Sequence, residues 1–209
     1  MKTLKNTIAT MLFATSVVAF AGPDSAIYVG VGLNQARHNY SSTFIRSMGY
    51  NTYTSDDSST NGKIYGGYRF NRYVGAELFY NNLGRSYYEG IIGGRNSRDE
   101  FKSDGFGAVA IGRLPLGGSD FALIGKLGFM NVRTTYTCME LCNNVTNTKN
   151  NAVAPVIGAG VEYDLNKNIG VRVDYERING GRASFTAGST TSTTRPMFDV
   201  ISLGLNLKF

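Results

Sequence analysis

The chain has 209 residues, of which 17% are charged, and its formal net charge is +6. The net positive charge is small and the basic residues are scattered, which argues against a nucleic-acid-binding surface. No apolar run reaches the ~20 residues of a membrane-spanning helix. Abundant glycine and tyrosine, four prolines and no tryptophan favour an all-β protein with many turns, either soluble or a membrane barrel.

The amino-terminal segment, residues 1–21, has the features of a secretory signal peptide. A positively charged start precedes a short apolar run from Met11 to Phe20 and a small-x-small motif that ends at Ala21. We therefore expect cleavage between Ala21 and Gly22, and a single β-barrel domain over residues 22–209.

Segments in which apolar and polar residues alternate recur along the rest of the chain, as is typical of half-buried strands. Eight strands are predicted at about 26–36, 63–70, 73–83, 102–114, 121–133, 152–165, 169–178 and 198–209. In most of them one face is clearly apolar. The fourth strand is the exception, because alanine, glycine, valine and isoleucine alternate there without a decisive face.

The connections between these strands alternate in length. Long polar segments cover 37–62, 84–100, 134–151 and 179–196, and tight turns lie between them at 71–72, 115–120 and 166–168. In an up-and-down meander every second connection lies at the same end, as in outer-membrane barrels. The pattern predicts an all-β, transmembrane up-and-down antiparallel β-barrel of eight strands, with short periplasmic turns, four long outer loops and a lumen that side chains can fill.

The closing strand has the most regular pattern. One face is apolar, and its residues are Ile201, Leu203, Leu205, Leu207 and Phe209. Such a stripe would make a soluble edge strand prone to aggregation, whereas a strand between lipid and a polar lumen requires it. A sandwich strand at the end of the chain is the alternative.

Four segments resemble the OmpA-like transmembrane barrel family: 67–85, 154–163, 169–175 and 202–209. The resemblance covers the mature chain except the long loops. It implies a Gram-negative outer membrane as the location, membrane lipid and lipopolysaccharide as surroundings, and an assembly machinery that reads the closing strand with its terminal Phe209. The sequence ends at the barrel, so the peptidoglycan-binding domain of longer members and its anchoring role are not expected. We expect a monomer.

Charged residues occur on the polar faces of several strands: Glu77, Lys126, Glu162, Arg172, Asp174 and Glu176. Both signs are present, and buried charges require partners, so we favour an ion-paired plug over an ion pathway or a catalytic carboxylate pair. The first four also match charged lumen positions of the family. The family's basic residue in the fourth strand would fall near Ile111, with Arg113 two residues further on.

No catalytic site, metal site or cofactor is predicted. Cys138 and Cys142 are close together in a polar segment, and the oxidising periplasm favours a disulfide between them. His38 is the only histidine, so a metal site lacks ligands. Its neighbours Ser41 and Ser42 lie in an expected loop, which would not preorganise a catalytic group.

Aromatic residues fall into two groups. Those near strand ends are expected at the membrane interfaces: Phe70, Tyr73, Tyr80, Phe121, Phe129, Tyr163 and Tyr175. Those in long loops, with nearby aliphatic residues, either contact a host or lipopolysaccharide surface or pack the loops together: Tyr40, Phe44, Ile45, Met48, Tyr50, Tyr53, Tyr87, Tyr88, Ile91 and Ile92.

These features predict a non-enzymatic outer-membrane surface protein that contributes to membrane integrity and to loop-mediated adhesion or host and immune interaction. The alternative is a narrow porin-like channel for ions or small solutes.

Overall fold

A computed structural model describes residues 26–39, 53–56, 60–92, 95–138, 148–180, 183–187 and 190–209. Its strands are β1 (Ala26–Asn39), β2 (Tyr53–Asp56), β3 (Thr60–Arg69), β4 (Val74–Ile92), β5 (Arg95–Pro115), β6 (Phe121–Cys138), β7 (Thr148–Asp164), β8 (Ile169–Asn179), β9 (Ala183–Ala187), β10 (Thr190–Thr194) and β11 (Met197–Lys208). Over these described ranges, no helix has the length and apolarity to cross a membrane.

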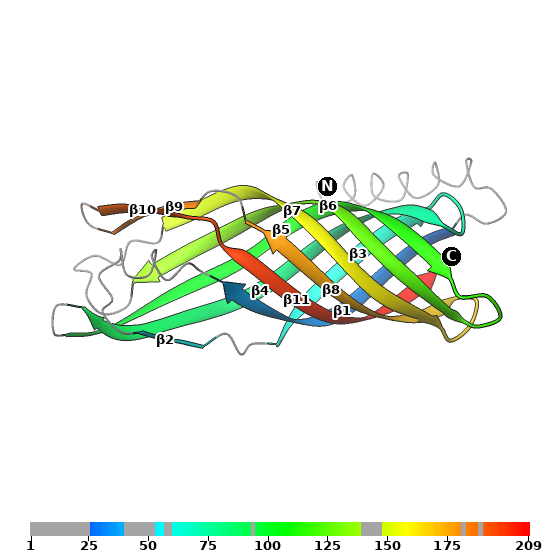
Figure 1. Cartoon of the computed structure of the whole chain (residues 1–209), viewed down its shortest axis with the longest axis horizontal. Helices are drawn as coiled ribbons and strands as arrows, with labels where there is room; N and C mark the ends of the chain where they lie inside the picture. The colour runs from blue at the N-terminus through cyan, green and yellow to red at the C-terminus, as the bar shows by residue number, and fades with distance from the viewer. Residues whose placement is uncertain are drawn as a thin grey trace, which may run out of the picture.

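Eight of these strands close into an antiparallel barrel (Figure 1). The order around the barrel is β1, β3, β4, β5, β6, β7, β8 and β11, and β11 pairs again with β1 along almost its whole length. The predicted fold class is therefore confirmed. Strand β2 pairs with the outer part of β4, and β9 and β10 form a separate hairpin.

The short turns and the C-terminus lie together at one end of the barrel (Figure 1). Asparagine side chains fix two of these turns. The Asn71 carboxamide oxygen accepts hydrogen bonds from the backbone of Tyr73 and Val74 at 2.8 and 2.9 Å. Asn166 closes its own turn in the same way, accepting from Asn168 and Ile169. Asparagine favours such turns because its side chain can substitute for a backbone acceptor.

Strand β4 and its partner β5 extend much further than predicted. The polar segment 84–100, which we expected to be a loop, is mostly paired strand, from Gly84↔Ser103 out to Ile92↔Arg95. A β-bulge between Asn82 and Gly84 shifts the register at the base of this extension, and Gly84 adopts a φ of 84°. The bulge interrupts the two-residue period, which is why the sequence pattern stopped there.

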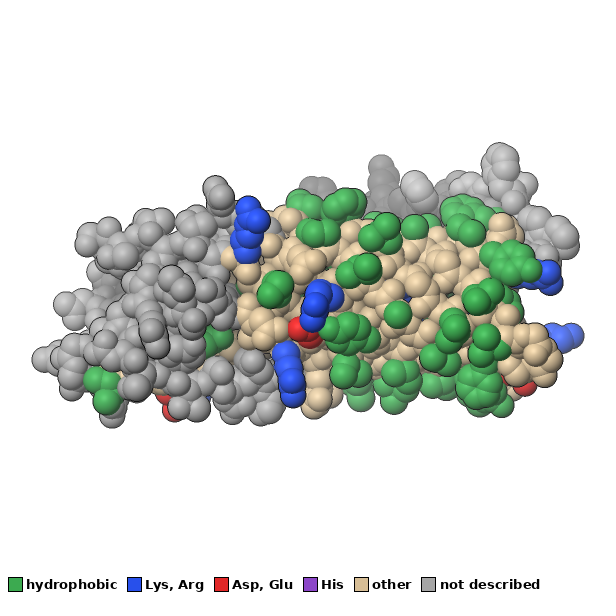
Figure 2. Space-filling view, viewed as in Figure 1, with side chains coloured by type: hydrophobic (Ala, Val, Ile, Leu, Met, Phe, Trp, Pro, Cys, Tyr) green, Lys and Arg blue, Asp and Glu red, His purple; other side chains and the backbone are tan. Residues whose placement is uncertain are grey.

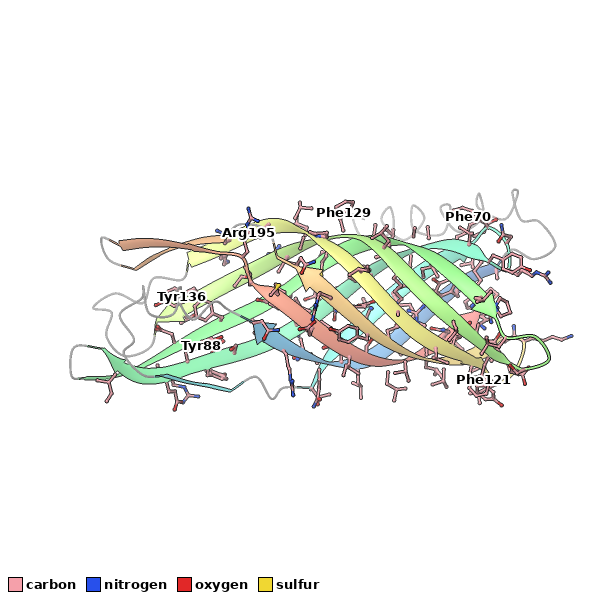
Figure 3. The ribbon with its side chains drawn as sticks, viewed as in Figure 1. Phe70, Tyr88, Phe121, Phe129, Tyr136 and Arg195 are labelled. Carbon is pink, nitrogen blue, oxygen red and sulfur yellow. The ribbon has the colours of Figure 1, made fainter. Side chains whose placement is uncertain are left out.

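The outer surface of the barrel is a band of apolar side chains (Figure 2). All five residues of the closing-strand stripe face outward, with exposed fractions from 43% at Leu205 to 76% at Phe209. Aromatic residues cluster at the turn end, where the rings of Phe121 and Tyr163 lie 4.6 Å apart, and Phe70 projects from the neighbouring turn (Figure 3). This arrangement is what lipid on the outside requires.

Several predictions fall outside the described residues. They are the signal peptide at residues 1–21, its cleavage between Ala21 and Gly22, and the loop residues 40–50. Cys142 also lies outside, and Cys138 ends β6 with a side chain that is not described. The predicted disulfide therefore stays a prediction.

Candidate functional site

The lumen of the barrel is lined by side chains that strand alternation turns inward. In β8, Arg172, Asp174 and Glu176 are buried, while the intervening Val173 and Tyr175 are 49% and 43% exposed on the outer face. Glycines alternate with bulky residues on the inner face and leave room for long charged side chains. The two-residue period thus brings the charges together at the centre of the barrel.

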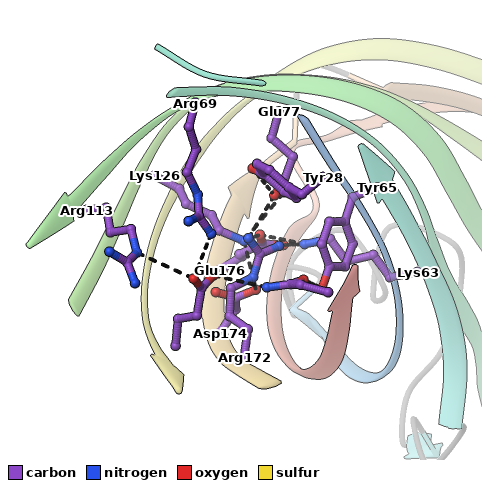
Figure 4. A network of polar contacts seen from close by, with 12 residues as sticks. Tyr28, Lys63, Tyr65, Arg69, Glu77, Arg113, Lys126, Arg172, Asp174 and Glu176 are labelled. Atoms are coloured by element: carbon purple, nitrogen blue, oxygen red, sulfur yellow. Dashed lines mark hydrogen bonds and ion pairs between the residues drawn. The ribbon is translucent and has the colours of Figure 1, made fainter. Parts of the chain in front are cut away.

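Lys126 of β6 is at the centre of the first cluster (Figure 4). Its ammonium nitrogen lies 2.8 Å from Asp174 Oδ2 and 2.9 Å from Glu176 Oε1 on β8. Glu77 Oε1 on β4 is 3.7 Å away, across the lumen. All four side chains are nearly or completely shielded from solvent, so each charge relies on its neighbours.

Arg172 joins the same cluster from the other side. Its Nη1 lies 2.8 Å from Glu77 Oε2, its Nε lies 3.0 Å from Asp174 Oδ2, and its guanidinium stacks 4.2 Å from the Tyr65 ring centroid. Lys63 of β3 completes the set with bonds of 2.6 and 2.7 Å to Glu176. The central cluster therefore contains three basic and three acidic groups: Lys63, Lys126, Arg172, Glu77, Asp174 and Glu176.

Glu162 belongs to a second cluster closer to the short turns. It contacts Arg69 at 2.7 Å, Lys208 at 3.1 Å and Arg113 at 3.4 Å. Asp164 adds a further acceptor, 3.0 Å from Arg113 Nη2 and in contact with Lys208.

A small cavity remains beside this second cluster. It has a volume of about 10 Å³ and is lined in part by Arg69, Arg113, Glu162 and Arg172. This volume is sufficient for about one water molecule. A substrate-sized site is not formed there.

Asn206 of β11 links the two clusters. Its carboxamide nitrogen donates to Glu162 Oε2 at 3.0 Å, and its oxygen accepts a hydrogen bond from the Tyr65 hydroxyl. On the neighbouring strand β1 the Tyr28 hydroxyl donates to Glu77 Oε2 at 3.0 Å. The two charge clusters are therefore connected to each other through Asn206 and Tyr65.

Two tyrosine rings fit against glycines of the facing strand. The ring of Tyr65 on β3 covers Gly30 on β1, where an added Cβ would lie 2.2 Å from the ring. Reciprocally, the ring of Tyr28 on β1 covers Gly67 on β3, at 2.3 Å. Glycine is required at both positions because any side chain would displace the ring.

The outer half of the lumen contains an apolar layer, interspersed with uncharged polar side chains such as the hydrogen-bonded pair Asn34 and Asn81, while Asp99 is buried further out. Leu83, Met130, Ile178 and Phe198 are fully buried there and belong to one hydrophobic cluster. Further out, Phe101 packs between Tyr136, at a centroid distance of 5.1 Å, and Tyr88, at 5.7 Å. An ion crossing the barrel would meet this apolar layer before it reached the charges.

The six predicted lumen charges all lie inside the barrel, but in two groups: Glu77, Arg172, Asp174 and Glu176 lie around Lys126, and Glu162 is separate from these five. Four partners were not predicted from the sequence: Lys63, Arg69, Asp164 and Lys208. Arg113 was named there only as lying two residues beyond the family's basic position. Lys63 and Arg69 lie an even number of residues from the buried Tyr65, so strand alternation could have placed both on the inward face. In β5 the inward face is Val109, Ile111 and Arg113, so the basic residue of this strand is Arg113.

His38 lies inside β1 and not in a loop beyond it. Its ring is 4% exposed and meets the edge of Phe198 at a centroid distance of 5.2 Å. Ser41 and Ser42 fall outside the described residues. Among the residues that the structure does describe, no group of three or more potential metal ligands is assembled.

The chain is similar to known outer-membrane proteins in sequence and in structure. A family model described as the OmpA-like transmembrane domain matches residues 23–209. Outer membrane protein A of Shigella dysenteriae is 31% identical over 208 residues, which cover 97% of this chain and 54% of that protein. The chain thus spans about half the length of this curated relative.

Two solved structures share the fold. Outer membrane protein OprG of Pseudomonas aeruginosa superposes with a TM-score of 0.60 at 17% identity, covering 89% of this chain and 96% of that one. Ail, the attachment invasion locus protein of Yersinia pestis, gives a TM-score of 0.53 at 14% identity, covering 89% of this chain and 99% of that one.

Proposed function

The chain belongs to the OmpA-like transmembrane domain family and is a β-barrel of the Gram-negative outer membrane, and from this premise we propose that it is a non-enzymatic surface protein. Its proposed roles are to support membrane integrity and to mediate adhesion or immune interaction through the parts that extend outward. The proposed surroundings are outer-membrane lipid and lipopolysaccharide, and the proposed state is a monomer that the barrel-assembly machinery inserts.

The observation that supports this proposal most strongly is the filled lumen. Paired charges occupy its centre and turn end, and a mixture of apolar and mostly uncharged polar side chains fills its outer half. A narrow channel, the competing proposal, would require these charges to separate and the apolar layer to admit ions, at the cost of unpaired buried charge. A catalytic role would require a carboxylate free to react, whereas Glu77, Asp174 and Glu176 each contact a cation.

The proposal for adhesion draws on the β4–β5 extension. Strand pairing continues past the apolar band to Ile92↔Arg95, which gives the extension a defined shape. Tyr88 turns inward and packs on Phe101, whereas Tyr87 turns outward beneath the Arg98 guanidinium at 4.6 Å. Ile91 is 44% exposed on the outward face. Alternation thus divides the aromatic residues of this segment between packing and a surface open to contacts.

This surface is chemically mixed. Arg85 pairs with Glu100 at 3.4 Å, and Arg98 pairs with Glu89 at 3.2 Å. The Arg98–Glu89 pair is exposed on both sides, and such pairs contribute about 0–1 kcal/mol to stability, so these two side chains can exchange partners at small cost. A protein or glycan surface with both donors and acceptors would suit them.

Adhesion is tested with a variant that replaces residues 87–98 with a two-residue turn. A non-adherent laboratory bacterium that displays the variant should bind cultured epithelial cells less than one that displays the unmodified protein. Because Ail was crystallised with a heparin analogue, a heparin-coated surface is a suitable second probe. Both strains must first show equal surface levels of folded barrel, and equal binding by both would contradict the adhesive role.

A further inference from the structure

Charged residues form a cluster on the outside of the barrel, where the apolar band ends. Three neighbouring strands place Arg37 (β1), Asp199 (β11) and Arg177 (β8) directly opposite one another in the register. Because side chains alternate along a strand, all three residues point to the lipid-facing side, as does Ile201, two residues beyond Asp199. Figure 2 shows basic and acidic side chains at this border of the green apolar surface.

Asp199 holds the cluster together. Its Oδ1 accepts from Arg177 Nε at 2.8 Å and from the Tyr175 hydroxyl at 2.6 Å, and its Oδ2 accepts from Asn39 at 2.9 Å. Arg177 Nη2 also donates to the Tyr175 hydroxyl at 3.3 Å. The hydrogen bonds to Asp199 and Tyr175 therefore fix one edge of the Arg177 guanidinium, while 49% of the side chain remains exposed.

Arg37 leaves the cluster with an excess of positive charge. Within the described part of the chain, no carboxylate lies within ion-pair distance of Arg37, which is exposed on the outer face. Two arginines thus lie on the strands on either side of Asp199, and only Arg177 forms an ion pair with it. The exposed pairs on the β4–β5 extension, in contrast, are matched one to one.

We propose that Arg37 and Arg177 bind the phosphate of a phosphorylated lipid in the outer leaflet, with Asp199 and Tyr175 positioning Arg177. Guanidinium groups bind phosphate through paired, charge-assisted hydrogen bonds. This inference rests on the proposed role in membrane integrity and assigns it a site.

The surface beneath the cluster identifies the ligand as a lipid. Leu33, Val173 and Ile201 lie on the same three strands, closer to the middle of the membrane, and are 63%, 49% and 61% exposed. A phosphate at the arginines would place attached acyl chains against this surface. A free phosphate ion would gain nothing from it.

The test measures lipid retention in nanodiscs of phosphatidylcholine that contain a small fraction of bisphosphorylated lipid A. Native mass spectrometry counts the lipid A molecules that remain bound as the barrel is released. A basic residue near a lipid surface changes binding about fivefold. Arg37→Gln and Arg177→Gln should each weaken retention by about that factor, and the double variant by about 25-fold.

Matched control variants distinguish a specific lipid-binding site from a general effect of positive charge. Arg72→Gln removes the same charge from an exposed position in a short turn at the opposite end, and should retain lipid A normally. Arg37→Lys keeps the charge and should recover part of the retention. Lipid A stripped of both phosphates should bind the unmodified protein and the double variant equally.

Two results would overturn the inference: equal losses in Arg37→Gln and Arg72→Gln, or unchanged retention in the double variant with its barrel folded. A separate measurement addresses the role in membrane integrity, namely detergent sensitivity of cells that display each variant. If the double variant loses lipid A but leaves detergent resistance unchanged, the lipid site stands and the proposed role fails.

Discussion

Arg172 and Glu77 form a buried ion pair between β8 and β4 at 2.8 Å, and both are almost completely shielded from solvent. Arg172→Ala leaves Glu77 without its closest cation, which should lower the free energy of unfolding by about 3–5 kcal/mol. The double change Arg172→Ala, Glu77→Ala should lower it by less than the sum of the two single changes. Urea unfolding in lipid vesicles measures all four proteins.

The exposed pair Arg98 and Glu89 is the matched control for this cycle, because its side chains are 45% and 59% exposed. Its coupling energy should be at most about 1 kcal/mol. Strict additivity for Arg172 and Glu77 would show that the contact contributes no coupling.

Gly30 is a second test at the scale of single residues. In Gly30→Ala the new methyl group would overlap the Tyr65 ring, so the ring and its hydrogen bond to Asn206 must shift, and the free energy of unfolding should fall by about 1–3 kcal/mol. Gly125→Ala is the control, since no atom lies within 4 Å of an added Cβ there. A loss in Gly125→Ala as large as in Gly30→Ala would argue against the tyrosine–glycine fit.

The β4–β5 extension depends on the bulge at its base. Gly84 has a φ of 84°, a conformation that costs a side-chain-bearing residue roughly 1–2 kcal/mol. Gly84→Ala should therefore increase amide hydrogen exchange in residues 84–92 and 95–103, with little change in the barrel below. Gly62→Ala, at a position without positive φ or close neighbours, should leave exchange unchanged. Unchanged amide hydrogen exchange in Gly84→Ala would mean that the bulge does not determine the conformation of the β4–β5 extension.

The closing strand can be tested through assembly. We expect Phe209→Ser to reduce insertion into the outer membrane because the assembly machinery reads the closing strand and its terminal aromatic residue. Phe129→Ser is the control, since it changes an outward-facing phenylalanine on β6, outside the closing strand. Cell-surface levels and the gel shift between unheated and boiled samples measure insertion. Normal levels of Phe209→Ser would remove the assembly signal.

At the element scale, the sequence predicted strand faces well wherever one face meets lipid and the other meets charge. In β8 this placed Arg172 and Asp174 inside without further information. The prediction of strand faces failed for β5. Its inward residues Val109 and Ile111 are apolar like its lipid-facing residues, so the sequence does not distinguish the two faces. The prediction also failed beyond Asn82, where the bulge changes the parity of the strand.

Which charges pair with each other could not be predicted from one sequence. Lys126 and Glu77 meet across the lumen at 3.7 Å, although β5 separates their strands on the wall. Such contacts depend on how far each strand is shifted against the next around the closed barrel. Periodicity specifies the face of a residue but not its height, so Glu162 could not be separated from the other five charges.

Taken as a whole molecule, the barrel has an apolar outer band, a lumen of paired charges below an apolar layer, and paired strands that rise beyond the membrane. This organisation leaves the outer surface as the part available to partners. Under the proposed function the lumen serves stability, and transport would require its rearrangement.

The conductance of the unmodified protein in planar lipid bilayers tests this account most directly. Because the charges are paired and the outer lumen is filled with side chains, we predict that the current stays at the baseline of the bare bilayer after insertion. Insertion is verified by the gel shift between unheated and boiled samples of the same preparation. Steady, high conductance from folded barrels would contradict the account and show that the charges line a pore.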